Sequence, residues 1–289
     1  IATAEPFDRL RPRLFGIAYR MLGTRADAED VVQDAWLRWH EAEQGALQSA
    51  EAWLVTVVTR LAIDRLRAAK AEREAYTGEW LPEPIVEWDL HTPEAIVERA
   101  GELSVAFMHM LERLGAEERA AFLLRQAFDY DYGEIAHMLG KSEAAVRQTV
   151  HRAGERLRLE RPRFDVPREK HRQLLDRFVQ AASTGERAAI RALLADDVAL
   201  IGDGGGKVPS FAGGLHGGDR VTNLYWAQFL RLGPRVRYER VTINGEPGLL
   251  RYMDGRLESA QAVVTDGERI VSIYAVRNPD KLARIAPGG

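Results

Sequence analysis

The chain has 289 residues, 46% of them hydrophobic and 29% charged, with a formal net charge of −3. This length allows two or three domains with cores of their own, and the composition is that of an ordinary soluble protein with no sign of disorder throughout. Because cysteine is absent, disulfides, thiol nucleophiles and cysteine zinc sites are excluded as well. No apolar run is long enough to cross a bilayer and the first residues lack the order of a signal peptide, so we expect a cytoplasmic protein that does not bind membranes.

Three helices are predicted between Phe7 and about residue 71. Gly23 interrupts the first apolar repeat, and Thr24 is placed to cap a second helix with Asp27 as the capping-box acid. The second helix is dense in carboxylates, a pattern typical of a solvated face. A third helix is predicted over residues 51–70, with an apolar side formed by Trp53, Leu54, Val57, Val58, Leu61 and Leu66. Its other side is charged and carries Arg60, Asp64, Arg65, Arg67 and Lys70.

Residues 132–158 have the pattern of a helix-turn-helix. Gly140 ends the first short helix and Ser142 caps the second. The inner side of the first helix is predicted to be Ile135, Ala136 and Leu139, and the buried stripe of the second Val146, Val150, Ala153 and Leu157. The outward residues Arg147, Gln148, His151 and Arg152 are therefore candidates for DNA binding, since Arg and Gln can contact a base edge bidentately. Thr149, between them in the sequence, is a further candidate. A basic helix face of this kind is also common where the helix is only exposed to solvent and binds no DNA.

Several separated motifs resemble those of the extracytoplasmic-function sigma factors of bacterial RNA polymerase. They are Ala28 to Asp34 followed by Trp36, the pair Trp53-Leu54, the run Asp64 to Arg67, and the helix-turn-helix. Together they extend over about the first 160 residues. The resemblance implies that the second helix binds the clamp helices of the polymerase's largest subunit through Asp30, Gln33, Asp34 and Trp36.

The same resemblance implies two DNA-reading parts. The third helix reads the downstream promoter element through Arg60, Asp64, Arg65 and Arg67, and the helix-turn-helix reads the upstream element. The polymerase then supplies the non-specific DNA affinity that a chain of negative net charge lacks. Arg60 stands where many of these proteins have Asn, and Thr149 where Arg is frequent, so no promoter sequence is transferred.

Residues 75–94 are predicted to be a linker with an extended path, because Pro82 and Pro84 forbid a continuous helix. Large apolar side chains at Trp80, Leu81 and Trp88 would be costly on a free linker, which indicates that the linker docks on another surface. A second helical domain follows over residues 95–163, and Pro162 and Pro167 mark the next boundary.

The remainder of the chain is predicted to be an α+β domain. Helices at 169–182 and 186–194 precede a strand at 198–201, a glycine-rich loop and a helix at 219–232. Further strands are joined by the turn pairs Asn244-Gly245, Asp254-Gly255 and Asp266-Gly267. Helices followed by an antiparallel meander describe a cone with a curved sheet, and the order resembles the SnoaL-like family of the NTF2-like fold.

Three motifs narrow the resemblance to sigma factors with a fused SnoaL-like domain. They are Trp80-Leu81-Pro82-Glu83-Pro84, Asp203-Gly204-Gly205-Gly206-Lys207 and Asn278-Pro279-Asp280-Lys281-Leu282. The predicted domains are a sigma region 2 domain (1–74), the linker (75–94), a sigma region 4 domain (95–163) and a regulatory SnoaL-like domain (168–289). The fold class is therefore two all-α domains followed by an α+β cone, and the predicted function is promoter-specific transcription initiation regulated by the C-terminal domain.

A second function class stays open, in which the C-terminal domain is an enzyme or a small-molecule-binding module with a DNA-binding appendage. Its candidate residues are Asp203, Lys207, His216, Asp219, Tyr225 and Tyr274. The glycine-rich loop does not fit a phosphate-binding P-loop, because Ile201 and Val208 replace its first Gly and its Ser or Thr. We expect no catalysis, cofactor or metal, and leave open whether a small molecule occupies the cone.

Overall fold

The computed structural model describes residues 5–43, 47, 49–87, 103–158 and 166–285. Its contacts divide the chain into two compact units. Among the described residues, the helical unit contains those up to Glu74 and those from Met110 to Arg158, and the sheet unit contains the linker residues 75–87, Leu103–His109 and everything from Val166 onward. The two helical segments therefore share one unit, and the linker belongs with the C-terminal domain. The four predicted domain ranges remain predictions, and Trp88 lies outside the described residues.

The first part of the helical unit folds as the capping signals predict. It contains α1 (Glu5–Leu22), α2 (Arg25–Glu41), α3 (Ala50–Ala68) and α4 (Lys70–Glu74). Thr24 accepts a hydrogen bond from the backbone N–H of Asp27, and Ser49 caps α3 in the same way. Gly23 separates α1 from α2 with a φ of 75°, a conformation that glycine adopts without strain.

The predicted apolar side of α3 was partly wrong. Val55, Ala62 and Ile63 are buried, whereas Trp53, Val57 and Leu61 are only half-buried. The reason is that α3 packs against α1 and α2 and also against two later helices, α6 (Ala116–Gln126) and α7 (Tyr132–Leu139). A helix that packs against neighbours on two sides buries a wider stripe of residues than the prediction, which assumed one buried side.

The second part of the helical unit contains α6 (Ala116–Gln126), α7 (Tyr132–Leu139) and α8 (Glu143–Arg158), while α5 (Val105–Leu111) runs from the sheet unit into it. Gly140 ends α7 in the left-handed region at φ 64°, and the Ser142 hydroxyl accepts from the N–H of Ala145. The predicted buried stripe of α8 is confirmed. In α7 the prediction needs one correction, because Met138 is buried and Leu139 only half-buried.

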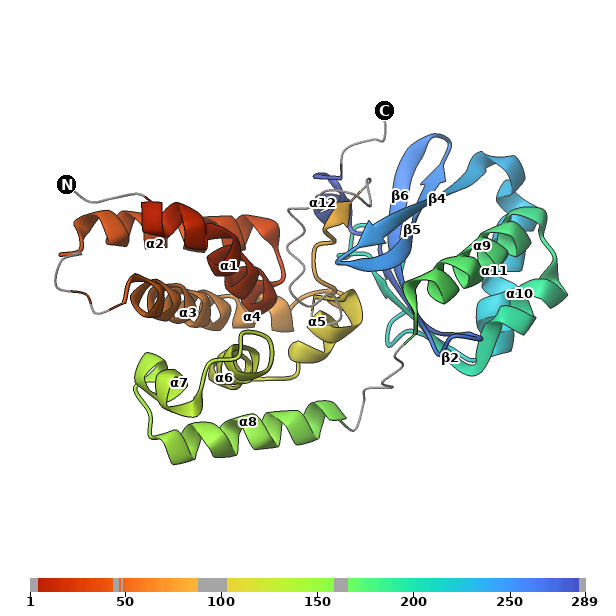
Figure 1. Ribbon diagram of the computed structural model, residues 1–289. Helices are drawn as coiled ribbons and strands as arrows, with labels where there is room; N and C mark the ends of the chain where they lie inside the picture. The colour runs from red at the N-terminus through yellow and green to blue at the C-terminus, as the bar shows by residue number, and fades with distance from the viewer. Residues whose placement is uncertain (1–4, 44–46, 48, 88–102, 159–165, 286–289) are drawn as a thin grey trace. The chain divides into compact units, whose positions relative to one another are not determined.

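Three helices cover one face of the sheet in the sheet unit (Figure 1). These are α9 (Arg168–Thr184), α10 (Arg187–Leu193) and α11 (Gly218–Leu232), which is followed by the short η3 (Gly233–Arg235). The strands are β1 (Val86–Glu87), β2 (Leu194–Asp203), β3 (Leu215–His216), β4 (Val236–Ile243), β5 (Glu246–Met253), β6 (Arg256–Thr265) and β7 (Ile270–Val276), and α12 (Pro279–Leu282) ends the described chain.

The sheet order is β1-β4-β5-β6-β7-β2-β3. Strands β4 to β7 form the predicted antiparallel meander, and β2 joins β7 in parallel. The first two turns have both central residues at positive φ, with Asn244 at 50° and Asp254 at 52°, as the tight hairpin type requires. The third turn differs, because Asp266 instead accepts hydrogen bonds from the N–H groups of Glu268 and Arg269.

Strand β1 was not predicted. It comes from the linker and pairs with β4, so the linker extends the sheet by one strand. None of the helices in the described ranges is long and apolar enough to cross a membrane.

Candidate functional site

The exposed side of α2 presents the residues predicted to bind the polymerase. Asp30, Gln33 and Asp34 are exposed, and Trp36 keeps 37% of its surface in solvent. Gln33 and Trp36 border a hollow of about 340 Å³ between α1 and α2. Leu37 follows Trp36 and is 48% exposed, and it was not among the residues predicted from the sequence. Leu37 lies about 200° around the helix from both Ala35 and Trp39, which are buried, and this spacing was the available signal.

The charged side of α3 is engaged inside the helical unit. Arg65 contacts Asp27 at 2.9 Å and Asp30 at 3.2 Å, and the hydrogen bond and charge of Asp27 raise the pKa of the Arg65 guanidinium. Arg60 donates from Nε to the carbonyl of Met138 at the end of α7, over 2.9 Å. The residues predicted to read the downstream element thus have partners on α2 and α7.

Arg67 connects α3 with α6. It pairs with Glu117 and also lies 3.8 Å from Asp64 on its own helix. Glu117 in turn binds Lys141 in the turn before α8, and these hydrogen bonds help lower the pKa of its carboxyl group. The α3 surface and the helix-turn-helix are therefore linked through one carboxylate.

The outward face of α8 is open to solvent. Arg147, Gln148, His151 and Arg152 are all exposed, whereas Thr149 is half-buried. Arg147 is held in place by Glu143 at 2.6 Å and by the ring of Tyr132, 4.3 Å from its guanidinium carbon. The four exposed side chains form one polar surface that can enter a major groove.

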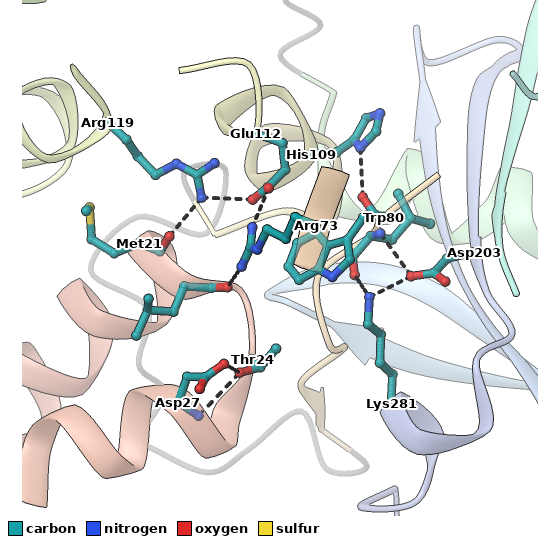
Figure 2. Close-up of polar contacts among 12 residues, drawn as sticks. Met21, Thr24, Asp27, Arg73, Trp80, His109, Glu112, Arg119, Asp203 and Lys281 are labelled. Carbon is teal, nitrogen blue, oxygen red and sulfur yellow. Dashed lines mark hydrogen bonds and ion pairs between the residues drawn. The ribbon is translucent and has the colours of Figure 1, made fainter. Parts of the chain in front are cut away.

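A buried arginine joins the two parts of the helical unit. Arg119 on α6 donates to the carbonyl of Met21 and to Glu112, each over 2.8 Å, and Figure 2 shows this cluster. Arg73 also pairs with Glu112 and reaches the carbonyl of Leu22. Burial alone would raise the pKa of Glu112, but the two arginines more than offset it and the pKa is lowered. The sequence reading missed this cluster because its partners are far apart in the chain.

A second cross-connection lies at the loop before α7. Arg13 on α1 donates to the carbonyl of Phe128 at 3.1 Å and to the Tyr130 hydroxyl at 3.2 Å. The Tyr130 hydroxyl donates onward to Glu51 on α3. The helical unit is thus closed, with α1 and α3 bound to the segment that carries the helix-turn-helix.

In the sheet unit the three motifs meet at Asp203, which is fully buried (Figure 2). Its carboxylate accepts from the Tyr76 hydroxyl at 2.6 Å and from the N–H of Leu81 at 2.9 Å. Lys281 binds the same carboxylate at 2.6 Å and also donates to the carbonyl of Leu81. We call this contact, formed by Tyr76, Trp80, Leu81, Asp203 and Lys281, the linker-docking site.

The remaining motif residues shape the same site. The Asn278 amide donates to the Tyr76 hydroxyl at 2.8 Å, and Asp280 pairs with Lys207. Within the linker motif Pro82, Glu83 and Pro84 are buried. Gly204 and Gly205 admit no side chain, because an added Cβ would lie 2.1 Å from the carbonyl oxygen of Val208 and 2.3 Å from the Asn278 amide nitrogen. Lys281 Nζ lies 4.0 Å from the centroid of the Trp80 ring, and Leu282 packs in the same core as Leu81.

The docking extends beyond the motifs. Leu81 is fully buried in a core with Ile243, Leu250 and Leu282. Asn244, at the turn between β4 and β5, accepts from the N–H of Ile85 and donates to the carbonyl of Leu103. Ile85 in the linker and Leu103 after it are thus bound to the same turn.

The candidate catalytic residues are distributed over the domain. Asp203 belongs to the linker-docking site, and Lys207 pairs with Asp280 beside it. Asp219 pairs with Arg191 on the surface, and Tyr274 lies beside His109. His216 is exposed and bonds to the carbonyl of Gly213, while Tyr225 is buried and bonds to Gln261.

Comparison with known proteins finds sigma-factor regions in both helical segments. The family models described as "Sigma-70 region 2" and "Sigma-70, region 4" match residues 7–72 and 104–157. The ECF RNA polymerase sigma factor SigJ of Mycobacterium tuberculosis is 37% identical over 287 residues, covering 95% of this chain and 91% of that protein. The probable ECF RNA polymerase sigma factor SigI of the same organism is 29% identical, covering 94% and 92%.

The fold is shared as well. A crystal structure of Mycobacterium tuberculosis SigJ superposes with a TM-score of 0.79 at 35% identity, covering 97% of this chain and 98% of that one. The similarity thus extends through the sheet unit and is not confined to the helices. The chain belongs to the ECF RNA polymerase sigma factors, which direct promoter-specific transcription initiation.

Proposed function

We propose that this sigma factor is restrained by its own C-terminal domain through the linker-docking site. The observation that carries the proposal is the buried Asp203 carboxylate, which binds a linker backbone N–H and the Lys281 ammonium at once. A buried charge with one partner removed is costly, so this carboxylate favours the docked linker over a free one.

The surfaces for polymerase and DNA are assigned within the same proposal. The exposed row Asp30, Gln33, Asp34 and Trp36 on α2 binds core RNA polymerase, and the α8 face reads the upstream promoter element. The charged residues of α3, namely Arg60, Asp64, Arg65 and Arg67, read the downstream element after they leave their present partners. Support comes from the exposure of the first two surfaces and from the match of both sigma regions.

Docking limits how far the helical segments can separate. The linker is bound at residues 76–87 by Asp203 and β4, and the chain after it is bound at Leu103 by Asn244. A chain fixed to one surface at two places has less length to extend than a free chain. The docked linker therefore favours the closed helical unit, in which Arg60 and Arg67 are engaged with α6 and α7. Undocking allows the helical segments to separate and reach two promoter elements.

Run-off transcription with core polymerase tests the proposal, on a promoter that the holoenzyme selects from random DNA. Burial of a side chain such as Leu81 contributes about 1.5–3 kcal/mol to docking, and a carboxylate in its place is excluded from the apolar core. We expect Leu81→Asp to transcribe several-fold more than the wild type. The matched control Leu81→Met conserves volume and apolar character and should transcribe as the wild type does. Equal or lower transcription by Leu81→Asp contradicts the restraint.

A further inference from the structure

The sheet unit contains a cavity of about 170 Å³, and its wall includes residues next to the docking motifs, with Gly202 before Asp203 and Arg277 before Asn278. It is enclosed by the loop that follows β2, by one face of α11 and by the inner sides of β5, β6 and β7. Apolar side chains contribute much of its wall, among them Leu200, Phe211 and Leu224. A space of this size with mixed walls fits a small organic molecule rather than water alone.

The charged groups of the cavity wall are two arginines and one glutamate. Arg251 is 4% exposed, and it pairs with Glu258 through one terminal nitrogen. Arg277 donates to the other oxygen of Glu258 from Nε at 2.7 Å. The wall thus carries an excess of one positive charge.

Arg251 also has an unused donor. Its Nε–H is buried and has no hydrogen-bond partner among the residues that the structure describes. A buried donor without a partner costs free energy, and a ligand acceptor would recover that cost. Guanidinium groups bind carboxylates in a planar, two-bonded geometry, so a carboxylate is the chemical group that fits this wall.

The wall is suited to binding rather than to acid–base chemistry. Burial alone would raise the pKa of Glu258, but Arg251 and Arg277 outweigh it and the pKa is lowered, so this group stays ionised. Neutral polar groups complete the wall, with the Tyr225 hydroxyl donating to Gln261 and Gln261 donating to Ser259. These neutral groups can form hydrogen bonds with a bound molecule, but none of them is acidic enough to transfer a proton to it.

Arg277 connects the cavity to the linker-docking site. Its side chain donates to the carbonyl of Pro209, and its backbone N–H donates to the carbonyl of Asp203 at 2.8 Å. The next residue, Asn278, also donates its backbone N–H to Asp203 and its side chain to Tyr76. A ligand that recruits Arg277 changes the contacts of the loop that positions Asp203.

We propose that this cavity binds a small monocarboxylate with an apolar body, and that the bound molecule alters the docking of the linker through Arg277. The second half rests on the regulatory docking proposed above, while the binding itself does not. The proposal thus makes the C-terminal domain a receptor for a small acidic metabolite.

Fluorine NMR on the full-length protein tests the binding. The probe is 4-fluorobenzoate, and its neutral isostere 4-fluorobenzamide is the control. We expect saturable binding of the acid with a dissociation constant of about 1 mM or tighter, and binding of the amide about tenfold weaker or more. Acetate and phenylacetate, added as competitors, bracket the size of the ligand. The site is overturned if none of the three acids binds, or if the amide binds as well as the acid.

Variants locate the binding. Arg277→Gln should weaken 4-fluorobenzoate by about tenfold or more, because it removes one charged donor. The control Arg240→Gln, on an exposed arginine that pairs with Asp176 and lies outside the cavity wall, should leave binding unchanged. Gln228→Trp fills the cavity from α11 without changing charge and should abolish binding. Wild-type affinity in both Arg277→Gln and Gln228→Trp overturns this location.

Hydrogen exchange at the amide of Leu81 tests the coupling, because this N–H donates to Asp203. Saturating 4-fluorobenzoate should change its exchange rate in the wild type and leave it unchanged in Arg277→Gln. Saturable binding with an unchanged exchange rate overturns the coupling. That result leaves the docking restraint itself intact, since run-off transcription of the Leu81 variants measures it without a ligand.

Discussion

The carboxylate of Asp203 accepts from four donors, which are the Tyr76 hydroxyl, the backbone N–H groups of Leu81 and Gly205, and the Lys281 ammonium. Burial and the neighbouring carboxylate raise the pKa of Tyr76, so this hydroxyl keeps its proton and donates it. A buried ion pair contributes little net stability but fixes geometry, since any other arrangement leaves a charge without partners. The linker accordingly docks in one register on the domain.

A single histidine should make the stability of the C-terminal domain depend on pH. His171 on α9 is buried, and burial lowers its pKa to about 4, with the charge of Arg168 acting in the same direction. In the unfolded chain His171 takes up a proton as the pH falls below about 6.5. In the folded domain His171 takes up this proton only near its lowered pKa of about 4. Stability should therefore fall as the pH drops through this window, by about 3 kcal/mol in total.

The variant His171→Gln isolates this contribution. Burial raises the pKa of the neighbouring Glu246, which is 4.0 Å from His171, and its protonation in the folded state gives a slope of opposite sign. The difference between wild type and variant removes that common background. Chemical denaturation at several pH values between 4 and 7 should show a flatter dependence in His171→Gln. Identical slopes would mean that His171 does not titrate differently in the two states.

Single residues were predictable from the sequence where a local rule applied. Thr24, Gly140 and Ser142 act as caps because capping involves only the next few residues. Arg119 was not predictable, since its partners Met21 and Glu112 are supplied by tertiary packing. Arg251 was missed for the same reason.

The proposed polymerase-binding and DNA-binding residues lie on two different helices, α2 and α8, which allows two matched tests. Gln33 on α2 and Gln148 on α8 are both exposed glutamines, so the same substitution can be made in each. We expect Gln33→Ala to weaken binding of core polymerase by about 1–2 kcal/mol, because it lies beside the exposed Trp36. Gln148→Ala should bind core polymerase as the wild type does. Measured affinities that are equal for the two variants contradict the assignment of α2.

The reciprocal test concerns promoter choice by the holoenzyme. Gln148→Ala should relax the preference at one base pair of the upstream element, at a cost of about 1–3 kcal/mol, because a base-edge contact is lost. Gln33→Ala should leave the preference unchanged. Competition among promoters with single base-pair changes measures both. Retained selection after alanine replacement of Arg147, Gln148, His151 and Arg152 together would show that another surface reads the DNA.

The elements themselves were largely predicted, with exceptions that share one cause. The period of apolar residues predicted α8 and the turn pairs predicted the β4–β5 and β5–β6 hairpins, because these signals are local. Strand β1 has two residues, and it exists only because β4 offers an unpaired edge. The wider burial of α3 likewise results from packing against α6 and α7, which no local period encodes.

In the whole molecule, the three motifs identified in the sequence form one docking site, although 200 positions separate Leu81 from Lys281. The family resemblance, rather than periodicity, indicated that they act together. The closed helical unit was not anticipated, because the resemblance assigns the charged residues of α3 to DNA and says nothing of their partners in the free protein. In the proposed function Arg60 and Arg67 exchange these partners for DNA, so closure of the helical unit is the point of control.

In the proposed function, docking of the linker keeps the helical unit closed, and a distance distribution measures this directly. The chain has no cysteine, so Arg38→Cys on α2 and His151→Cys on α8, both at exposed positions, accept a dye pair for single-molecule energy transfer. In the free protein we predict one narrow population for the wild type and for Leu81→Met. Leu81→Asp should add a second population at lower transfer efficiency, and a distribution identical to that of the wild type would contradict the claim.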